Sequence, residues 1–177
     1  KFANGFAART RGVAVGNGMD PDTKMGPLAH GRRPDAIEAL VDDAVSRGAR
    51  VMAGGGRIDG GFFYQPTVLA DVPLEADIMS NEPFGPVALI QPFDTEEEAI
   101  SSANRLPYGL ASFMFTENGR RAARVSDAIE AGMVGINSFA ISGADSPFGG
   151  VKHSGFGSEG GREGLEPFLN VKAIHQA

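Results

Sequence analysis

Cysteine and tryptophan are both absent from the 177 residues, and no apolar stretch approaches the length of a membrane span. Without Cys, the chain can form no disulfide and supplies neither a thiolate metal ligand nor a thiol nucleophile. A membrane-spanning helix needs about 18 or more consecutive apolar residues. We therefore expect that these residues do not enter a membrane.

Positive charge is also scarce. Sixteen Lys and Arg residues against 22 Asp and Glu residues give a formal net charge of -6 and a sequence pI near 5.0. The Arg residues are scattered along the chain, so it lacks the basic stripe with which many proteins bind nucleic acid. We therefore expect no nucleic-acid partner.

The remaining composition is that of an ordinary globular protein. Hydrophobic residues make up 42% of the chain and charged residues 21%, so a core can form in one sizeable domain or two small ones. Residues 1–11 begin with Lys1 instead of Met and have the pattern of the middle of a helix, without the apolar core of a signal peptide. We therefore expect a segment of a longer, cytoplasmic protein.

Helical and strand patterns alternate along the chain. After Pro34, apolar residues recur with the spacing of a core-facing helix that ends near Gly48. Thr95 and Glu98 form a capping-box pattern for a second helix over 96–104. Further helices are expected over 119–131 and 158–168, and strands over 50–53, 62–69, 86–93, 111–115, 133–136 and 170–175. This order predicts an α/β fold with a mostly parallel sheet flanked by helices.

A carboxylate and an aromatic ring stand two residues apart in the segment 81–86 (NEPFGP), directly before an expected strand. Two interpretations remain open. The prolines and the glycine favour a rigid structural turn. Alternatively, Glu82 binds a ligand, because one carboxylate can accept hydrogen bonds from both hydroxyls of a ribose.

Other patterns that suggest chemistry lack the context they need. The spacing G-x-G-x-x-G from Gly155 to Gly160 follows a short polar segment, not the apolar strand of a dinucleotide-binding turn, so we favour glycines that permit close backbone packing. The three His residues are far apart, with no carboxylate at metal-ligand spacing, so no metal site is expected. Ser154 lacks the surroundings of a nucleophile, and we interpret it as a turn hydroxyl.

Four motifs occur in a fixed order along the chain. They are E-x-F-G-P at 82–86, NRLPYGL at 104–110, GMVGIN at 132–137 and PFGGVKHSG at 147–155. Together they resemble the C-terminal part of the catalytic domain of the NAD(P)-dependent aldehyde dehydrogenases, and the resemblance extends over essentially the whole chain. The loop 137–146 (NSFAISGADS) is most similar to succinate-semialdehyde dehydrogenases and relatives that act on aldehydes with a distant carboxylate.

The resemblance implies a covalent mechanism. In this family a Cys thiolate attacks the aldehyde, hydride passes to the nicotinamide of NAD or NADP, and a Glu activates the water that hydrolyses the thioester. The nucleophile, the general base and the cofactor domain precede these motifs in the family, so no catalytic residue is assigned to this chain. We expect the 177 residues alone to be inactive, and the complete protein to oxidise succinate semialdehyde or a similar acidic semialdehyde.

The same resemblance implies roles for five residues. Glu82 would hold the ribose hydroxyls beside the nicotinamide, and Phe84 would pack beside the nicotinamide ring. Phe139, Ser142 and Phe148 would line the substrate funnel, with Ser142 donating a hydrogen bond to a substrate carboxylate. For the two funnel phenylalanines, an ordinary role in the core is the alternative.

The resemblance also implies a domain organisation. Residues 1–168 correspond to a partial catalytic domain, and residues 169–177 to a C-terminal oligomerisation strand in a homo-dimer or tetramer. The expected partner is a small-molecule aldehyde, with neither nucleic acid nor a membrane. The alternative is a non-catalytic fragment or paralogue that acts as a structural or interaction module. A reading frame that starts near Lys1, without an upstream Cys and cofactor domain, would favour that alternative.

Overall fold

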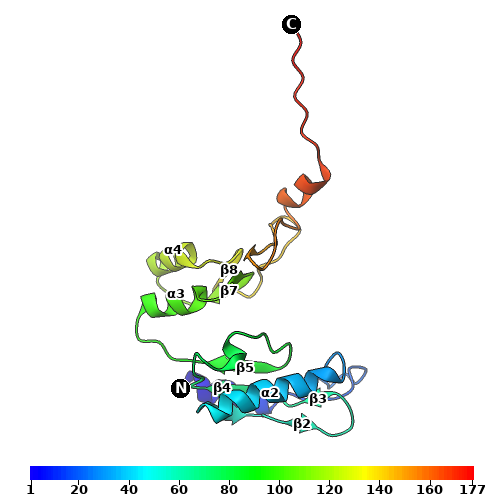
Figure 1. The fold of residues 1–177 in the computed structure, drawn as a ribbon, viewed down its shortest axis with the longest axis vertical. Coiled ribbons are helices and arrows are strands. Elements are labelled where there is room, and N and C mark those ends of the chain that lie inside the picture. The colour runs from blue at the N-terminus through cyan, green and yellow to red at the C-terminus, as the bar shows by residue number, and fades with distance from the viewer. The chain divides into compact units, whose positions relative to one another are not determined.

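The computed structural model describes residues 1–177 and separates them into two compact units, Lys1–Pro92 and Phe93–Ala177. Both units combine helices and strands (Figure 1), but the alternation that the sequence predicts is absent from the first unit, where two helices are followed by four strands. The strands form four small sheets instead of one mostly parallel sheet. None of the helices combines the length and the apolar character that a membrane crossing requires.

The first unit is built on a three-stranded sheet with β4 (Thr67–Ala70) at its centre. β1 (Arg50–Ala53) pairs with β4 in the antiparallel direction, and β5 (Val87–Ile90) pairs with it in the parallel direction. Every residue of β4 is buried. A strand buried on both faces is expected at the centre of a sheet that helices cover on each side.

Two helices supply this cover. α1 (Phe2–Arg11) packs against β1 and β4, where Ala7 meets Val68 in a small apolar cluster. α2 (Arg32–Ser46) places Ile37 and Val41 in the larger core around Leu69. Val68 and Leu69 therefore serve opposite faces of the sheet, because successive side chains of a strand alternate.

The strand expected over 62–69 is divided at Gln65 and Pro66. It forms β3 (Phe63–Tyr64), which pairs with β2 (Arg57–Ile58), and then the central strand β4. Pro66 has no N–H to donate to a sheet, and the N–H of Gln65 bonds to the carbonyl of Gly56. The short helix η1 (Asp77–Met79) packs against α2 and completes the unit.

The second unit contains a β-α-β element. β7 (Ala111–Met114) and β8 (Met133–Ile136) are parallel, and α4 (Gly119–Ala128) connects them. α3 (Glu96–Asn104) packs against α4. A two-stranded antiparallel pair joins β6 (Tyr108–Gly109) to β9 (Val151–Lys152).

The predicted capping box of α3 forms in one half only. The Oγ1 of Thr95 accepts a hydrogen bond from the N–H of Glu98 at 3.1 Å, as predicted. The Glu98 carboxylate reaches the N–H of Asp94 at 2.9 Å instead of that of Thr95. The helix begins at Glu96 and ends at Asn104, the bounds that the sequence predicts.

The two predictions for the C-terminal end are wrong for this chain. The helix expected over 158–168 is reduced to a 3-10 helix, η2 (Glu163–Phe168), because Gly160 and Gly161 have positive φ and Pro167 lacks an N–H. The strand expected over 170–175 does not form, and residues 169–177 are all exposed. A strand needs a neighbouring strand to satisfy its backbone, and no strand of this chain pairs with this segment.

Candidate functional site

Glu82 and Phe84 lie in the loop between η1 and β5 of the first unit. The Glu82 carboxylate is exposed and makes no hydrogen bond within the chain. Phe84 is 67% exposed and has a φ of 45°, in the left-handed region that non-glycine residues seldom adopt. Both side chains are therefore accessible to a ligand, on a backbone with an unusual fixed conformation.

Helix α2 holds this loop from one side. The Nη2 of Arg33 donates to the carbonyl oxygen of Pro83 at 2.5 Å, and the Arg33 guanidinium carbon lies 5.6 Å from the centre of the Phe84 ring. A side chain at Gly85 would collide with Ile37, so the loop backbone lies directly on the helix. The sequence carries no local signal for this role of Arg33, because the loop that it contacts lies 50 residues away.

The other end of the loop continues into the sheet. The carbonyl of Pro86 accepts a hydrogen bond from the N–H of Thr67 at 2.7 Å, and the N–H of Val87 bonds to the carbonyl of Gly85 at 2.8 Å. Because Thr67 begins the central strand, the C-terminal end of the loop is attached to a fully buried part of the unit. The structural-turn and ligand-binding interpretations of this segment are thus compatible.

The three residues assigned to the substrate funnel all lie in the second unit, after β8. Phe139 is 74% exposed, and its ring contacts those of Phe113 and Phe115 at centroid distances of 5.3 Å and 5.2 Å. Ser142 is exposed, and its hydroxyl makes no hydrogen bond within the chain. Phe148 exchanges two backbone hydrogen bonds with Glu159 at 2.7 Å and 2.8 Å.

These positions bear on the alternative that Phe139 and Phe148 are ordinary core residues. Neither ring is buried in this chain, since Phe148 is 36% exposed. Phe139 instead extends an aromatic cluster whose other members, Phe113 and Phe115, belong to β7 and its end. The loop therefore presents apolar rings and a free hydroxyl at the surface of the second unit.

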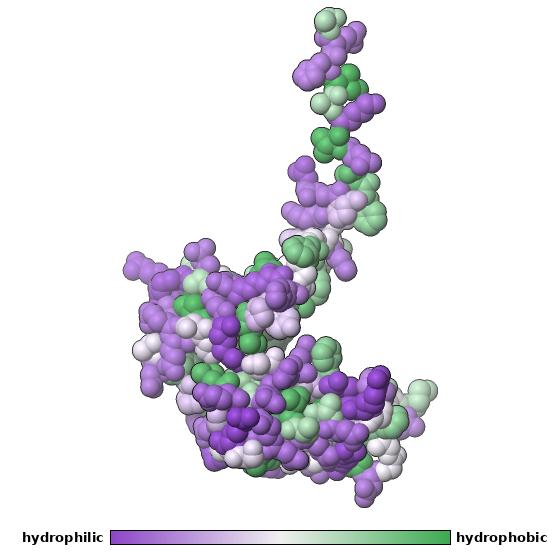
Figure 2. Space-filling view, in the orientation of Figure 1, coloured by the Kyte–Doolittle hydropathy of each residue, from purple (hydrophilic) through white to green (hydrophobic).

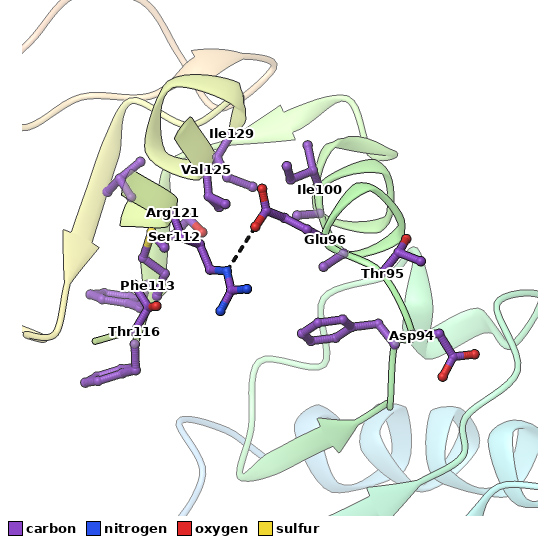
Figure 3. Close-up of a pocket in the computed structure, with 16 residues that line it drawn as sticks. Asp94, Thr95, Glu96, Ile100, Ser112, Phe113, Thr116, Arg121, Val125 and Ile129 are labelled. Atoms are coloured by element: carbon purple, nitrogen blue, oxygen red, sulfur yellow. Dashed lines mark hydrogen bonds and ion pairs between the residues drawn. The ribbon is translucent and has the colours of Figure 1, made fainter. Parts of the chain in front are cut away.

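A cavity of about 530 Å³ lies between α3, α4 and β7 (Figure 3). Ile100, Val125 and Ile129 contribute apolar side chains to its wall. Glu96 lies at its edge, 2.7 Å from Nε of Arg124 and 3.0 Å from Nε of Arg121. The hydrogen bond from Arg124 is the main reason that the pKa of Glu96 lies below its usual value.

The polar residues at the edge of this cavity link α3 to α4 and provide no group that is free to take part in catalysis. Glu96 is already paired with two arginines, so its carboxylate is held in the ionised form and is not poised to transfer a proton. None of the five residues that the sequence analysis assigned to cofactor or substrate lines it. The nearest link is through Phe113 and Phe115, which line the cavity and contact the ring of Phe139.

Three of the four motifs that carried the resemblance meet at one place. Ser154 Oγ accepts a hydrogen bond from the N–H of Gly109 at 2.9 Å, which confirms its interpretation as a turn hydroxyl. A side chain at Gly132 would collide with the carbonyl of Gly149. Lys152 Nζ donates to the carbonyl oxygen of Asn104 at 3.1 Å. These motif residues hold the second unit together.

The G-x-G-x-x-G segment behaves as the packing interpretation predicts. Gly155, Gly157 and Gly160 have φ values of 132°, 79° and 67°, and no α-helix follows them. A dinucleotide-binding turn directs its glycines to the start of a helix. A side chain at Gly160 would lie 2.7 Å from the carbonyl of Ser146, so the backbones cross closely there.

Comparison with known proteins assigns the chain to a family. A family model described as aldehyde dehydrogenase matches residues 1–174. The chain belongs to the aldehyde dehydrogenase family. This confirms the resemblance seen in the four motifs, and the α/β class is confirmed by the likeness to solved aldehyde dehydrogenases.

Individual relatives are similar over almost all of the chain. The succinate-semialdehyde dehydrogenase of Paenarthrobacter nicotinovorans is 47% identical over 175 residues, which are 98% of this chain and 39% of that protein. The 4-(hydroxymethyl)benzenesulfonate dehydrogenase of Comamonas testosteroni is 47% identical over 174 residues, or 98% of this chain and 36% of that protein.

A crystal structure of the betaine aldehyde dehydrogenase of Staphylococcus aureus in complex with NAD+ has a TM-score of 0.90 and 39% identity. That match covers 96% of this chain and 35% of the solved chain. The chain therefore spans less than two fifths of the length of these relatives.

Proposed function

We propose that these residues belong to an enzyme that oxidises an aldehyde with a remote anionic group to the carboxylic acid, with NAD or NADP as acceptor. The complete protein is called the parent enzyme below. The aldehyde is inferred from the family, and the observation that carries the remote anionic group is the 47% identity to relatives named for succinate semialdehyde and for 4-(hydroxymethyl)benzenesulfonate, an alcohol. Both compounds bear a negative charge far from the reacting carbon.

The loop of Glu82 and Phe84 fits a nicotinamide cofactor. The Glu82 carboxylate is exposed and free of protein partners, so it can accept hydrogen bonds from both hydroxyls of a ribose. The Phe84 ring is mostly exposed and can pack beside a flat ring. When bound, NAD or NADP supplies the acceptor for the hydride that leaves the aldehyde carbon.

In this proposal Glu82 acts by position and not by proton transfer. Hydride transfer requires donor and acceptor carbons within about 3–3.5 Å, so a small displacement of the nicotinamide ring is costly. A carboxylate that grips both ribose hydroxyls limits such displacements. Glu82 sits on a loop held by α2 and by the central strand, which suits it to this role.

Recognition of the substrate is assigned to the second unit. The Ser142 hydroxyl donates to the remote anionic group of the substrate, and Phe139 and Phe148 provide apolar walls for the connecting chain. The free hydroxyl and the exposed rings support this assignment. The chain contains no Cys, so the nucleophile of the covalent mechanism must come from another part of the parent enzyme.

Glu82→Gln in the parent enzyme tests the cofactor assignment. This variant keeps the shape of the side chain but loses the charged acceptor, so hydride transfer slows by about ten- to a hundredfold. With a substrate that carries deuterium on the aldehyde carbon, a primary isotope effect on kcat is expected to emerge. Glu75→Gln, an exposed position before η1 in the same unit, is the control and should change neither quantity.

The opposite outcome is equally clear. If Glu82→Gln gives an undiminished burst of reduced cofactor followed by stalled turnover, Glu82 serves thioester hydrolysis and its assignment to the cofactor is wrong. The non-catalytic alternative has its own test. If the complete protein reduces neither NAD nor NADP with any acidic aldehyde, the result would favour a structural or interaction module.

Ser142→Ala tests the substrate class. Loss of one hydrogen bond to a charged group should lower kcat/KM by about ten- to a hundredfold for succinate semialdehyde. An uncharged aldehyde of similar length should be unaffected, and Ser101→Ala on the exposed face of α3 is the matched control. Equal losses for both aldehydes would show that Ser142 is only a loop residue.

A further inference from the structure

We infer that Arg33 is the positioning residue that sets the conformation of the loop carrying Glu82 and Phe84. Arg33 lies in the first turn of α2, and its side chain contacts two consecutive residues of that loop. The inference rests on the proposed function, because the loop matters for hydride transfer only if Glu82 and Phe84 bind a nicotinamide cofactor.

The two contacts of Arg33 constrain different parts of the loop. The bond from Nη2 to the Pro83 carbonyl fixes the peptide between Pro83 and Phe84, one residue after Glu82. The guanidinium beside the Phe84 ring fixes the direction of that ring through a cation–π contact. One side chain thus links the residue proposed to grip the ribose to the residue proposed to pack beside the nicotinamide.

The loop needs such a contact because its backbone is strained. Phe84 has a φ of 45°, and a residue with a side chain remains in this region only when its surroundings hold it there. On the far side of Phe84, the absence of a side chain at Gly85 lets the backbone rest on Ile37. Arg33 on one side and this close packing on the other hold Phe84 between them.

Arginine is suited to this place and lysine is not equivalent to it. The guanidinium is planar and carries several donors, so it can donate to a carbonyl while it faces an aromatic ring. A Lys ammonium on the same stem can make one of these contacts at a time. Arg33→Lys should therefore retain part of the ability to fix the loop. Arg33→Met, which keeps a similar apolar length, should retain none.

The first measurement uses the 177-residue chain itself. Order parameters from ¹⁵N relaxation of the Glu82 and Phe84 amides should fall from about 0.85 to below about 0.6 in Arg33→Met. Amides of the central strand β4 should not change, which shows that the unit remains folded. Arg32→Met is the control, because Arg32 is exposed and makes no hydrogen bond or ion pair of its own.

The second measurement uses the parent enzyme. Arg33→Met should lower kcat about tenfold and produce a primary isotope effect with a substrate deuterated on the aldehyde carbon. The KM for the aldehyde should change less. Arg33→Lys should recover part of the loss. Combined with Glu82→Gln, the two substitutions should cost much less than the product of their separate effects, because both act through one carboxylate.

The outcomes separate this inference from the proposed function. If the parent enzyme oxidises aldehydes with NAD or NADP and Arg33→Met changes neither the order parameters nor the isotope effect, the inference is overturned. If the loop becomes mobile in Arg33→Met but the parent enzyme has no cofactor-dependent activity, the proposed function fails, while the role of Arg33 in fixing the loop conformation stands. Arg33→Met and Glu82→Gln effects that simply multiply would also overturn the inference.

Discussion

The helices of the two units are stabilised in different ways. In the first unit, α1 and α2 have no side-chain hydrogen bond at their N-termini, but each buries residues in the core. In the second unit, α3 and α4 bury no residue fully, but Thr95 and Asn118 cap them, and Glu96 links them through Arg121 and Arg124. Burial and local hydrogen bonding thus replace one another.

The same contrast appears in the cores. All but one of the buried hydrophobic residues belong to the first unit, and the exception is Met133 on β8. Apolar side chains of the second unit are instead distributed over its surface (Figure 2). A unit with open apolar faces has little burial energy of its own, so its order depends on caps, ion pairs and close backbone packing. The Glu82 loop is attached to the unit with the core, and the Ser142 loop to the unit without one.

The largest test of this contrast compares two leucines. Leu69 on the central strand is 0% exposed, and its replacement by Ala should lower the free energy of unfolding of the first unit by about 3–5 kcal/mol. Leu110 in the second unit is 42% exposed, and Leu110→Ala should cost less than about 1 kcal/mol. Urea unfolding followed by amide signals from each unit separately provides the measurement. Similar costs for the two substitutions would contradict the contrast.

The two tyrosines of the chain allow a test at alkaline pH. Tyr64 in the first unit is buried, its hydroxyl has no hydrogen-bond partner, and desolvation raises its pKa to about 12. Between pH 10 and pH 12 the unfolded phenol loses its proton while the folded phenol keeps it. The first unit should therefore lose about 2–3 kcal/mol of stability as the pH rises through this range.

Absorbance at the phenolate band makes this prediction measurable. Tyr108→Phe leaves Tyr64 as the only tyrosine, and the chain has no Trp to interfere. Tyr64→Phe should abolish the alkaline loss of stability and should be neutral or stabilising at neutral pH, because it removes an unpaired buried hydroxyl. If Tyr64 ionises near pH 10 in the folded chain, the first unit is not as tightly packed as we describe.

Sequence reasoning succeeded where the signal is local. The bounds of α3 follow from a capping residue at one end and a proline after the other, and both signals lie within a few residues of the helix. The strand over 62–69 was predicted, but its division was not, because the pairing of Phe63 and Tyr64 depends on β2. The terminal strand was expected from the order of elements along the chain and from the resemblance, and it does not form without a neighbouring strand.

The candidate site also shows that sequence patterns reveal local features and miss contacts between distant segments. The motifs identified the family and brought Glu82 to attention, because these residues are adjacent in the sequence. They could not identify Arg33, whose contacts with Pro83 and Phe84 depend on how α2 packs beside a distant loop. They also did not show that Gly109 and Gly132 allow close backbone packing, or that the Ser154 hydroxyl bonds to Gly109, because only the fold brings these segments together.

Two glycines test whether close backbone packing stabilises the second unit. A side chain at Gly132 would collide with the backbone at Gly149, so Gly132→Ala should destabilise the unit by about 2 kcal/mol or more. Gly119, the first residue of α4, has open space around it, and Gly119→Ala should stabilise the unit by about 0.5 kcal/mol. Thermal unfolding monitored by circular dichroism gives both values. A neutral Gly132→Ala would mean that close backbone packing does not stabilise this unit.

A smaller and more local loss of stability is expected at the caps on which the second unit depends. Thr95→Ala removes the acceptor for the N–H of Glu98 and should cost about 1 kcal/mol. Because α3 buries no residue fully, this loss should appear as fraying of its first turn, seen as faster hydrogen exchange at the amides of Glu98 and Ala99. Thr95→Ser keeps the hydroxyl and should restore slow exchange. The contrasting helix is α2, which starts without a side-chain cap and is held by Ile37 and its neighbours. Exchange at the start of α2 should not change in either variant. If Thr95→Ala leaves the amides of α3 as protected from exchange as before, the cap does not stabilise this helix. The contrast between capped helices in the second unit and buried helices in the first would then be wrong.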